Sequence, residues 1–241
     1  MRLSDLVVRF RGGTSIPAAN LLAQAYASER VLTAARGRTN VHYQTSTEDA
    51  RITITIDTEF EFIGRDLTAT SLIKHEPKRL GEPVKVRKIV RNGVRCLRDR
   101  TGTHTDSVPQ DFDPRKELDI LDMSFLRSVL ETATRVRTIG QRSVRGVACD
   151  VIEFVLAPEA DQYLSQLNAR TIPDASLDST INVTHIRGRL ALGTADHQWH
   201  QLSLSILGPS RLKADEHHFF AFVQTIWDRN ASDIAIPLPD V

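Results

Sequence analysis

One stretch of the chain alternates between polar and apolar residues, and it constrains the fold more than any other feature of the sequence. Between Arg51 and Ile63 the apolar positions share one parity: Ile52, Ile54, Ile56, Phe60 and Phe62. Thr58 interrupts this set, and the charged residues take the other parity. Because successive side chains of a strand point to opposite faces, the pattern predicts a long antiparallel strand with one wet and one apolar face.

Similar alternation recurs along most of the chain, with turn residues between the runs. Asn92-Gly93 is a strong hairpin signal because both residues tolerate positive φ. The expected strands are 51–63, 67–75, 84–91, 94–99, 135–139, 147–156, 181–192, 198–207 and 217–227. The segment 101–113 is rich in turn residues and is expected to be a loop.

Two longer segments have helical periodicity. Ser15 is a candidate N-cap with Pro17 in the first turn, and an alanine-rich helix is expected to continue to about Ala35, with Gly37 as its stop. Its apolar stripe favours a helix on a protein core over one on a membrane surface. A second helix is expected between Leu118 and Thr134, and a short one over 158–168.

This order of elements predicts a mainly β fold with α-helices (α+β). We expect a single large curved antiparallel sheet, a half-barrel, with helices covering the concave face; a closed barrel is the alternative. Residues 1–15 are expected to be an N-terminal arm and 16–241 one domain. Either architecture would enclose a cavity for an apolar ligand, unless side chains fill the interior.

Composition narrows the possible partners. Lys and Arg total 31 and Asp and Glu total 30, so the formal charge is +1 and no nucleic-acid partner is expected. No run of apolar residues approaches the roughly 18 to 20 that a membrane-spanning helix needs, so no membrane-spanning segment is expected. The protein is expected to be periplasmic or otherwise extracytoplasmic if a signal or anchor was removed, and cytoplasmic otherwise.

The chain has two cysteines, Cys96 and Cys149. Two are too few for a disulfide scaffold or a cysteine-based zinc site, although one bridge between them stays open. Because the numbered chain carries no export signal, we expect free thiols.

Four segments resemble the LolA-like fold, which outer-membrane lipoprotein carriers share with LppX- and LprG-type lipoproteins that hold glycolipids. They are residues 41–43 after the alanine-rich helix, the hairpin 89–97, the glycine-bounded segment 140–152 and the ending 227–237. The resemblance extends from about residue 18 to the end. It does not explain the N-terminal arm, and the numbered chain has neither the signal peptide nor the lipidation cysteine of such lipoproteins.

The resemblance implies a carrier, without cofactor or metal, whose concave apolar face shelters acyl chains, a glycolipid or another hydrophobic small molecule. A protein partner is also conceivable. Each buried methylene would contribute about 0.8 kcal/mol. The proposed lining residues, each of which could instead be plain core, are Ile52, Ile54, Ile56, Phe60, Phe62, Leu67, Ala69, Ile73, Phe125 and Val129.

The fold also resembles that of VioE, an enzyme that rearranges a hydrophobic intermediate without metal or cofactor. An isomerase or cyclase acting in the same cavity is therefore the alternative, and a sensor or assembly module is a third. The sequence has no nucleophile elbow, phosphate-binding loop or cysteine metal spacing. Glu59 and Glu61 share one strand face and could act as acid and base, although a solvated face fits them better.

Histidines and arginines are the other candidates for chemistry. His197 and His200 sit where a strand begins and should point to opposite faces, which disfavours a metal site. The adjacent His217 and His218 should also face opposite sides. One of these histidines or His185 could instead be a general base inside a cavity. The arginines that could meet a lipid phosphate or carboxylate at a cavity mouth, or simply face solvent, are Arg187, Arg189, Arg95 and Arg98. A carrier should have an almost purely apolar cavity, and an enzyme at least two convergent titratable side chains.

Overall fold

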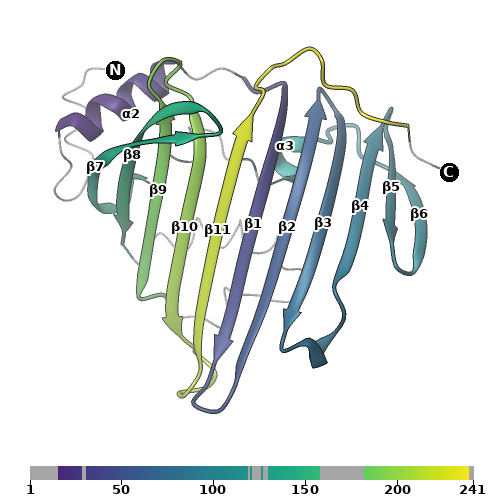
Figure 1. Cartoon of the computed structure of the whole chain (residues 1–241), viewed down its shortest axis with the longest axis horizontal. Helices are drawn as coiled ribbons and strands as arrows, with labels where there is room; N and C mark the ends of the chain where they lie inside the picture. The colour runs from purple at the N-terminus through teal and green to yellow at the C-terminus, as the bar shows by residue number, and fades with distance from the viewer. Residues whose placement is uncertain are drawn as a thin grey trace.

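The computed structural model describes residues 16–28, 31–118, 120, 126, 130–157 and 182–238. They form one antiparallel sheet of eleven strands in the order β6-β5-β4-β3-β2-β1-β11-β10-β9-β8-β7 (Figure 1). The first and last strands of this order do not pair, so the sheet is an open half-barrel and not a closed barrel. The expected α+β fold with one large sheet is therefore confirmed.

The strands occupy most of the described chain. Their bounds are β1 (Ala34–Ser46), β2 (Arg51–Ile63), β3 (Asp66–Glu76), β4 (Val84–Arg91), β5 (Val94–Asp99), β6 (Gly102–Ser107), β7 (Ala133–Val144), β8 (Val147–Leu156), β9 (His185–Gly193), β10 (Trp199–Pro209) and β11 (His217–Trp227). The helical elements are α2 (Ile16–Ser28), the 3₁₀ turn η1 (Lys78–Leu80) and α3 (Pro114–Glu117).

Strand β2 lies between β1 and β3, and its successive side chains point to opposite faces of the sheet. Phe60 and Phe62 point to the face that carries the main core, whereas Glu59 and Arg51 are exposed. We call the core-bearing face the inner face and the opposite one the outer face. The hairpin expected at Asn92-Gly93 joins β4 to β5, with φ of 52° and 80°, as a type I′ turn requires.

The first helix is shorter than the sequence analysis expected. It ends at Ser28, and Ala34 and Ala35 already belong to β1. Gly37 lies inside that strand and is not a helix stop. Helix propensity extends through these alanines, but pairing with Ile63 and Phe62 of β2 determines their conformation.

The same helix lies elsewhere on the sheet than expected. Its buried residues Ala18, Leu22 and Ala25 join the main core, as an amphipathic helix should. However, the strand that α2 contacts most is β7, at the far side of the sheet from β2 (Figure 1). The helix therefore does not cover the apolar face of β2.

Two further expectations differ from the structure. The expected loop 101–113 contains β6, which pairs with β5 although all its residues are exposed. A strand without an apolar face leaves no alternation in the sequence. Within the second helix expected over 118–134, the described residues Leu126, Leu130 and Glu131 are helical, but Ala133 already starts β7, and the short helix α3 lies before the expected start. Most of 119–129 and the short helix expected over 158–168 lie outside the described residues.

Both cysteines are buried and unpaired. Cys96 lies on β5 and Cys149 on β8, and seven strands separate these two in the sheet order. Because a disulfide needs Cα atoms within about 7 Å, the sheet holds the two cysteines too far apart for an intramolecular bridge.

Candidate ligand-binding site

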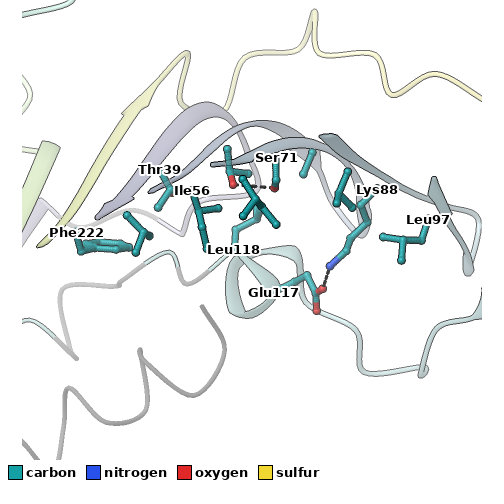
Figure 2. Close-up of a pocket in the computed structure, with 13 residues that line it drawn as sticks. Thr39, Ile56, Ser71, Lys88, Leu97, Glu117, Leu118 and Phe222 are labelled. Carbon is teal, nitrogen blue, oxygen red and sulfur yellow. Dashed lines mark hydrogen bonds and ion pairs between the residues drawn. The ribbon is translucent and has the colours of Figure 1, made fainter. Parts of the chain in front are cut away.

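A cavity of about 270 Å³ lies between the inner face of the sheet and the end of α3 (Figure 2). Six strands, β1 to β5 and β11, form its floor, and Glu117 and Leu118 lie over it. Its lining residues are Thr39, Val41, Ile56, Thr58, Ala69, Ser71, Ile73, Val86, Lys88, Leu97, Glu117, Leu118 and Phe222. Eight of these are apolar, so the cavity is mainly hydrophobic.

The apolar floor is a row of cross-strand neighbours. Val41 on β1 pairs with Ile56 on β2 and with Phe222 on β11, and Ile56 pairs with Ile73 on β3. Directly opposed residues on one face of a sheet have Cβ atoms about 5 Å apart. Strand register alone therefore assembles a continuous apolar surface across four strands.

A polar row runs beside the apolar one. Thr58 and Ser71 share a hydrogen bond of 2.8 Å between their hydroxyls, and Thr39 pairs with Thr58 across the strands. The fully buried Gln224 donates from Nε2 to Thr39 Oγ1 and to the carbonyl oxygen of Leu118, both at 3.1 Å. This amide therefore ties the cover of the cavity to its floor.

An ion pair lies at one side of the cavity. Lys88 Nζ on β4 contacts the Glu117 carboxylate on α3, and both side chains are 28% exposed (Figure 2). Asp113 caps α3 by accepting a hydrogen bond of 2.9 Å from the backbone N–H of Arg115, which fixes the helix that carries Glu117. The two charges compensate each other, so the described lining carries no net charge.

The residues that the sequence analysis proposed as lining fall into several groups. Those that line the cavity are Ile56, Ala69 and Ile73. Those that are buried within the main core are Phe60, Phe62 and Leu67. Ile54 is half-buried against that core, and Ile52 is 39% exposed near the start of β2. Phe125 and Val129 lie outside the described residues.

Several lining residues were not proposed from the sequence. Val86 and Leu97 belong to expected strands whose inner parity was readable. Lys88 shares parity with Val84, Val86 and Val90, and a lysine within such an apolar set is a sequence signal for a polar group facing a cavity. Phe222 and Leu118 could not be identified without knowing that β11 pairs with β1 and that α3 lies over β2 and β3.

A second polar cluster lies on the inner face at the far end of β1. Tyr43 Oη and His218 Nδ1 are 2.8 Å apart, and Thr45 donates to Tyr43 Oη at 3.0 Å. Glu216 Oε1 lies 3.1 Å from His218 Nε2, within ion-pair distance but off the direction of a hydrogen bond. Burial lowers the pKa of His218 and raises that of Tyr43. As expected, the adjacent His217 points the other way and is exposed.

The remaining candidates for chemistry lie away from the cavity. Glu59 and Glu61 are on the outer face, where Glu61 accepts a hydrogen bond of 3.1 Å from Arg36. His200 contacts Asp196 at 2.9 Å. No group of three or more His, Cys, Asp or Glu suited to a metal ion occurs in the described part of the chain.

Of the arginines proposed for a cavity mouth, Arg187 and Arg189 lie on the outer face, opposite the cavity. Arg189 there contacts Glu153 at 3.3 Å, and Glu153 also accepts from Arg137 at 2.7 Å. Arg95 pairs with Asp106. These arginines therefore do not line the cavity and do not form a headgroup site there.

No family model matches the sequence, and no match was found among curated proteins. Solved structures match across most of the chain. LprF from Mycobacterium bovis has 12% identity and a TM-score of 0.50, covering 95% of this chain and 99% of LprF. Lipoprotein LppX from Mycobacterium tuberculosis has 12% identity and a TM-score of 0.46, with 90% of this chain and 98% of LppX covered. A LolA superfamily protein from Nitrosomonas europaea has 11% identity and a TM-score of 0.25, with 92% of this chain and 95% of that protein covered.

The described helices include none that is long and apolar enough to cross a membrane. At 12% identity, the similarity to LprF supports a shared fold and no further conclusion. It agrees with the order of elements expected from the sequence and with the open eleven-stranded sheet. The chain has the LolA-like fold.

Proposed function

We propose that the chain binds the apolar part of a hydrophobic ligand, such as a lipid or an acyl chain, in the inner-face cavity, and carries it. The observation that carries this proposal is the apolar row of Val41, Ile56, Ile73 and Phe222, which borders open space that the side chains of the described residues do not fill. Apolar surface left unfilled in a folded protein is costly unless something covers it.

The size of the cavity limits what enters it. Ligand pockets commonly measure about 300–1,000 Å³, so we expect a cavity of about 270 Å³ to hold one alkyl chain segment rather than several acyl chains side by side. Six buried methylenes would contribute about 5 kcal/mol before the cost of association. A glycolipid or lipoprotein would therefore insert one chain and leave its head outside.

The polar groups of the lining suit an uncharged ligand segment. Thr39, Thr58 and Ser71 could bond an ester or hydroxyl oxygen beside the apolar row. The charges of Lys88 and Glu117 cancel, so the lining offers no uncompensated charge to an ionised head. The ligand's charged groups, where present, would stay in solvent.

The rest of the proposal follows from the LolA-like fold. We propose that residues 16–241 act as one carrier domain and that the protein works outside the cytoplasm, as the resemblance to lipoprotein carriers implies. A protein that donates or accepts the ligand would be its partner.

A second candidate function is an isomerase or cyclase acting on a hydrophobic intermediate. One observation favours it: Lys88 and Glu117 are two titratable side chains that line the same cavity. Against it, the two groups pair with each other, whereas an acid and a base need free access to substrate. The carrier is the better supported reading.

Native mass spectrometry of the purified protein, followed by extraction of bound molecules, tests the proposal. A carrier should release an unaltered hydrophobic molecule, and a fluorescent fatty-acid probe should bind saturably. Ile56→Glu should abolish probe binding because a carboxylate there lacks compensation, and Glu59→Ala on the outer face should leave it intact. Absence of probe binding by the wild type would contradict the carrier, and conversion of an extracted molecule on incubation would favour the enzyme.

A further inference from the structure

The hairpin of β7 and β8 bends over the outer face of the sheet. The ladder shifts register between Thr138 and Gly140, and Gly140 has a φ of 123°, which glycine adopts readily. Beyond this bulge, Val144 and Cys149 pack with Ala191 of β9 in a small core of their own. Figure 1 shows the hairpin tip crossing over the neighbouring strands. This bend places residues of β7 beside β10, β11 and β1.

A pocket of about 250 Å³ lies under the bent hairpin. Its lining residues are Arg38, Arg142, Ser143, Val144, Arg145, Gln201, Thr225 and Trp227. Three are arginines and none is acidic, although the chain as a whole has nearly equal numbers of basic and acidic residues. The pocket is therefore a local concentration of positive charge.

Arg145 occupies a backbone position that is unfavourable for arginine. It is the first central residue of a type I′ turn, with φ of 49°, followed by Gly146 with φ of 85°. Asn, Asp and Gly are preferred there, and the β4–β5 turn of this chain has Asn92 at the same place. Strained positions of this kind often serve function. The Arg145 guanidinium lies 3.8 Å from the ring centre of Trp227, which orients it while leaving its N–H edges available.

Arg142 is held by neutral groups. Its Nη2 donates to Gln201 Oε1, and Gln201 Nε2 donates to Thr225 Oγ1 at 2.8 Å. This chain of hydrogen bonds fixes the guanidinium without neutralising it. Arg38, by contrast, forms a bidentate contact with the Asp57 carboxylate, so its charge is compensated.

Two guanidinium charges therefore remain uncompensated. Within the described residues, neither Arg142 nor Arg145 has a carboxylate within ion-pair distance. A phosphate group carries about −1.5 to −2 charges at pH 7 and accepts bidentate hydrogen bonds from arginine. We propose that Arg142 and Arg145 bind a phosphate-type oxyanion in this outer-face pocket, with Trp227 and Gln201 as positioning residues. The proposal is independent of the apolar ligand on the inner face.

Isothermal titration calorimetry of the full chain with inorganic phosphate tests the site, and flotation with phosphatidylcholine vesicles containing phosphatidylglycerol tests whether a lipid headgroup supplies the phosphate. The test variant is Arg142→Gln/Arg145→Asn, in which asparagine suits the left-handed backbone and should preserve the turn. The matched control for the arginine at position 142 is Arg187→Gln, an exposed outer-face arginine on β9 outside the pocket. Arg142→Lys keeps the charge but loses the bidentate geometry.

Saturable phosphate binding that weakens at least tenfold in the double variant, and is unchanged in Arg187→Gln, supports the site. If free phosphate does not bind, but vesicle binding weakens in the double variant and is unchanged in Arg187→Gln, the site is supported with a lipid headgroup as the source of the phosphate. Arg142→Lys should also weaken binding in either case. Binding of neither probe, or equal weakening by Arg187→Gln, overturns the proposal, provided that thermal unfolding shows each variant folded.

Discussion

The ring of Phe60 on β2 lies against Gly37 on β1, so close that a Cβ at position 37 would be 2.1 Å from Phe60 Cζ. The pair belongs to the same cross-strand row as Ala69, which lines the cavity. The glycine lets the aromatic ring lie flat on the sheet and closes the core beside the cavity.

We expect Gly37→Ala to destabilise the protein by about 1–3 kcal/mol, because the ring must leave its position in a packed core. Urea unfolding measures this. Gly37→Ala/Phe60→Leu should lose less than the sum of the two single variants, since the smaller side chain makes room for the new methyl group. Strict additivity would show that the two residues do not contact each other.

Stability should depend on pH through His218. Burial lowers its pKa below the ordinary 6.5, so the unfolded chain takes up a proton first as the pH falls. The stability contributed by neutral His218 is complete above pH 6.5 and declines below it. Glu216 opposes this shift, whereas His217 and Lys213 reinforce it.

His218→Asn should reduce the acid-induced loss of stability, because asparagine keeps an acceptor for Tyr43 and does not titrate. Unfolding curves of both proteins at several pH values below 6.5 make the comparison. An identical pH dependence in the variant would show that other groups account for the acid sensitivity.

The ion pair at the cavity should contribute little to stability. Lys88 and Glu117 are each 28% exposed, and such pairs are worth about 1 kcal/mol or less. We therefore expect Glu117→Gln to change the free energy of unfolding by about 1 kcal/mol at most and to leave binding of an uncharged apolar probe unchanged. A loss of probe binding in this variant would show that the pair shapes the cavity or acts on the ligand.

Both cysteines should react slowly in the folded protein. Cys149 is fully buried and its pKa is raised by burial, so little thiolate is present, and Cys96 is also buried. Alkylation without reductant should add labels slowly to the native chain and two labels after unfolding. Absence of labels on the unfolded chain would indicate a bridge and contradict the strand order.

The sequence predicted the sheet better than the cavity. The alternation in β2 and the Asn92-Gly93 turn are local signals, and both were confirmed. By contrast, β6 has no apolar face, and Ala34 and Ala35 are strand residues because they pair with Ile63 and Phe62 of β2. These features depend on neighbours that are distant in sequence.

The candidate site was only partly readable for the same reason. Ile56, Ala69 and Ile73 could be proposed from alternation, but Phe60 has the same parity and fills the core. Ile56 and Phe60 differ in what packs against them from the other side of the core, and sequence periodicity carries no information about such contacts. The turn at Arg145 was missed because arginine is not a residue that signals a type I′ turn.

Probe titration of a cavity-filling variant tests the central claim most directly. Ala69 lines the cavity, so Ala69→Leu should place apolar atoms where the ligand's chain would lie, and Thr70→Leu on the outer face of β3 is its matched control. For a series of single-chain fatty acids, the wild type should bind more tightly with each added methylene, by up to about 0.8 kcal/mol, until the cavity is full. Ala69→Leu should weaken binding and shorten the optimal chain, with Thr70→Leu unchanged. Equal binding by Ala69→Leu and the wild type, or no dependence on chain length, would contradict the account.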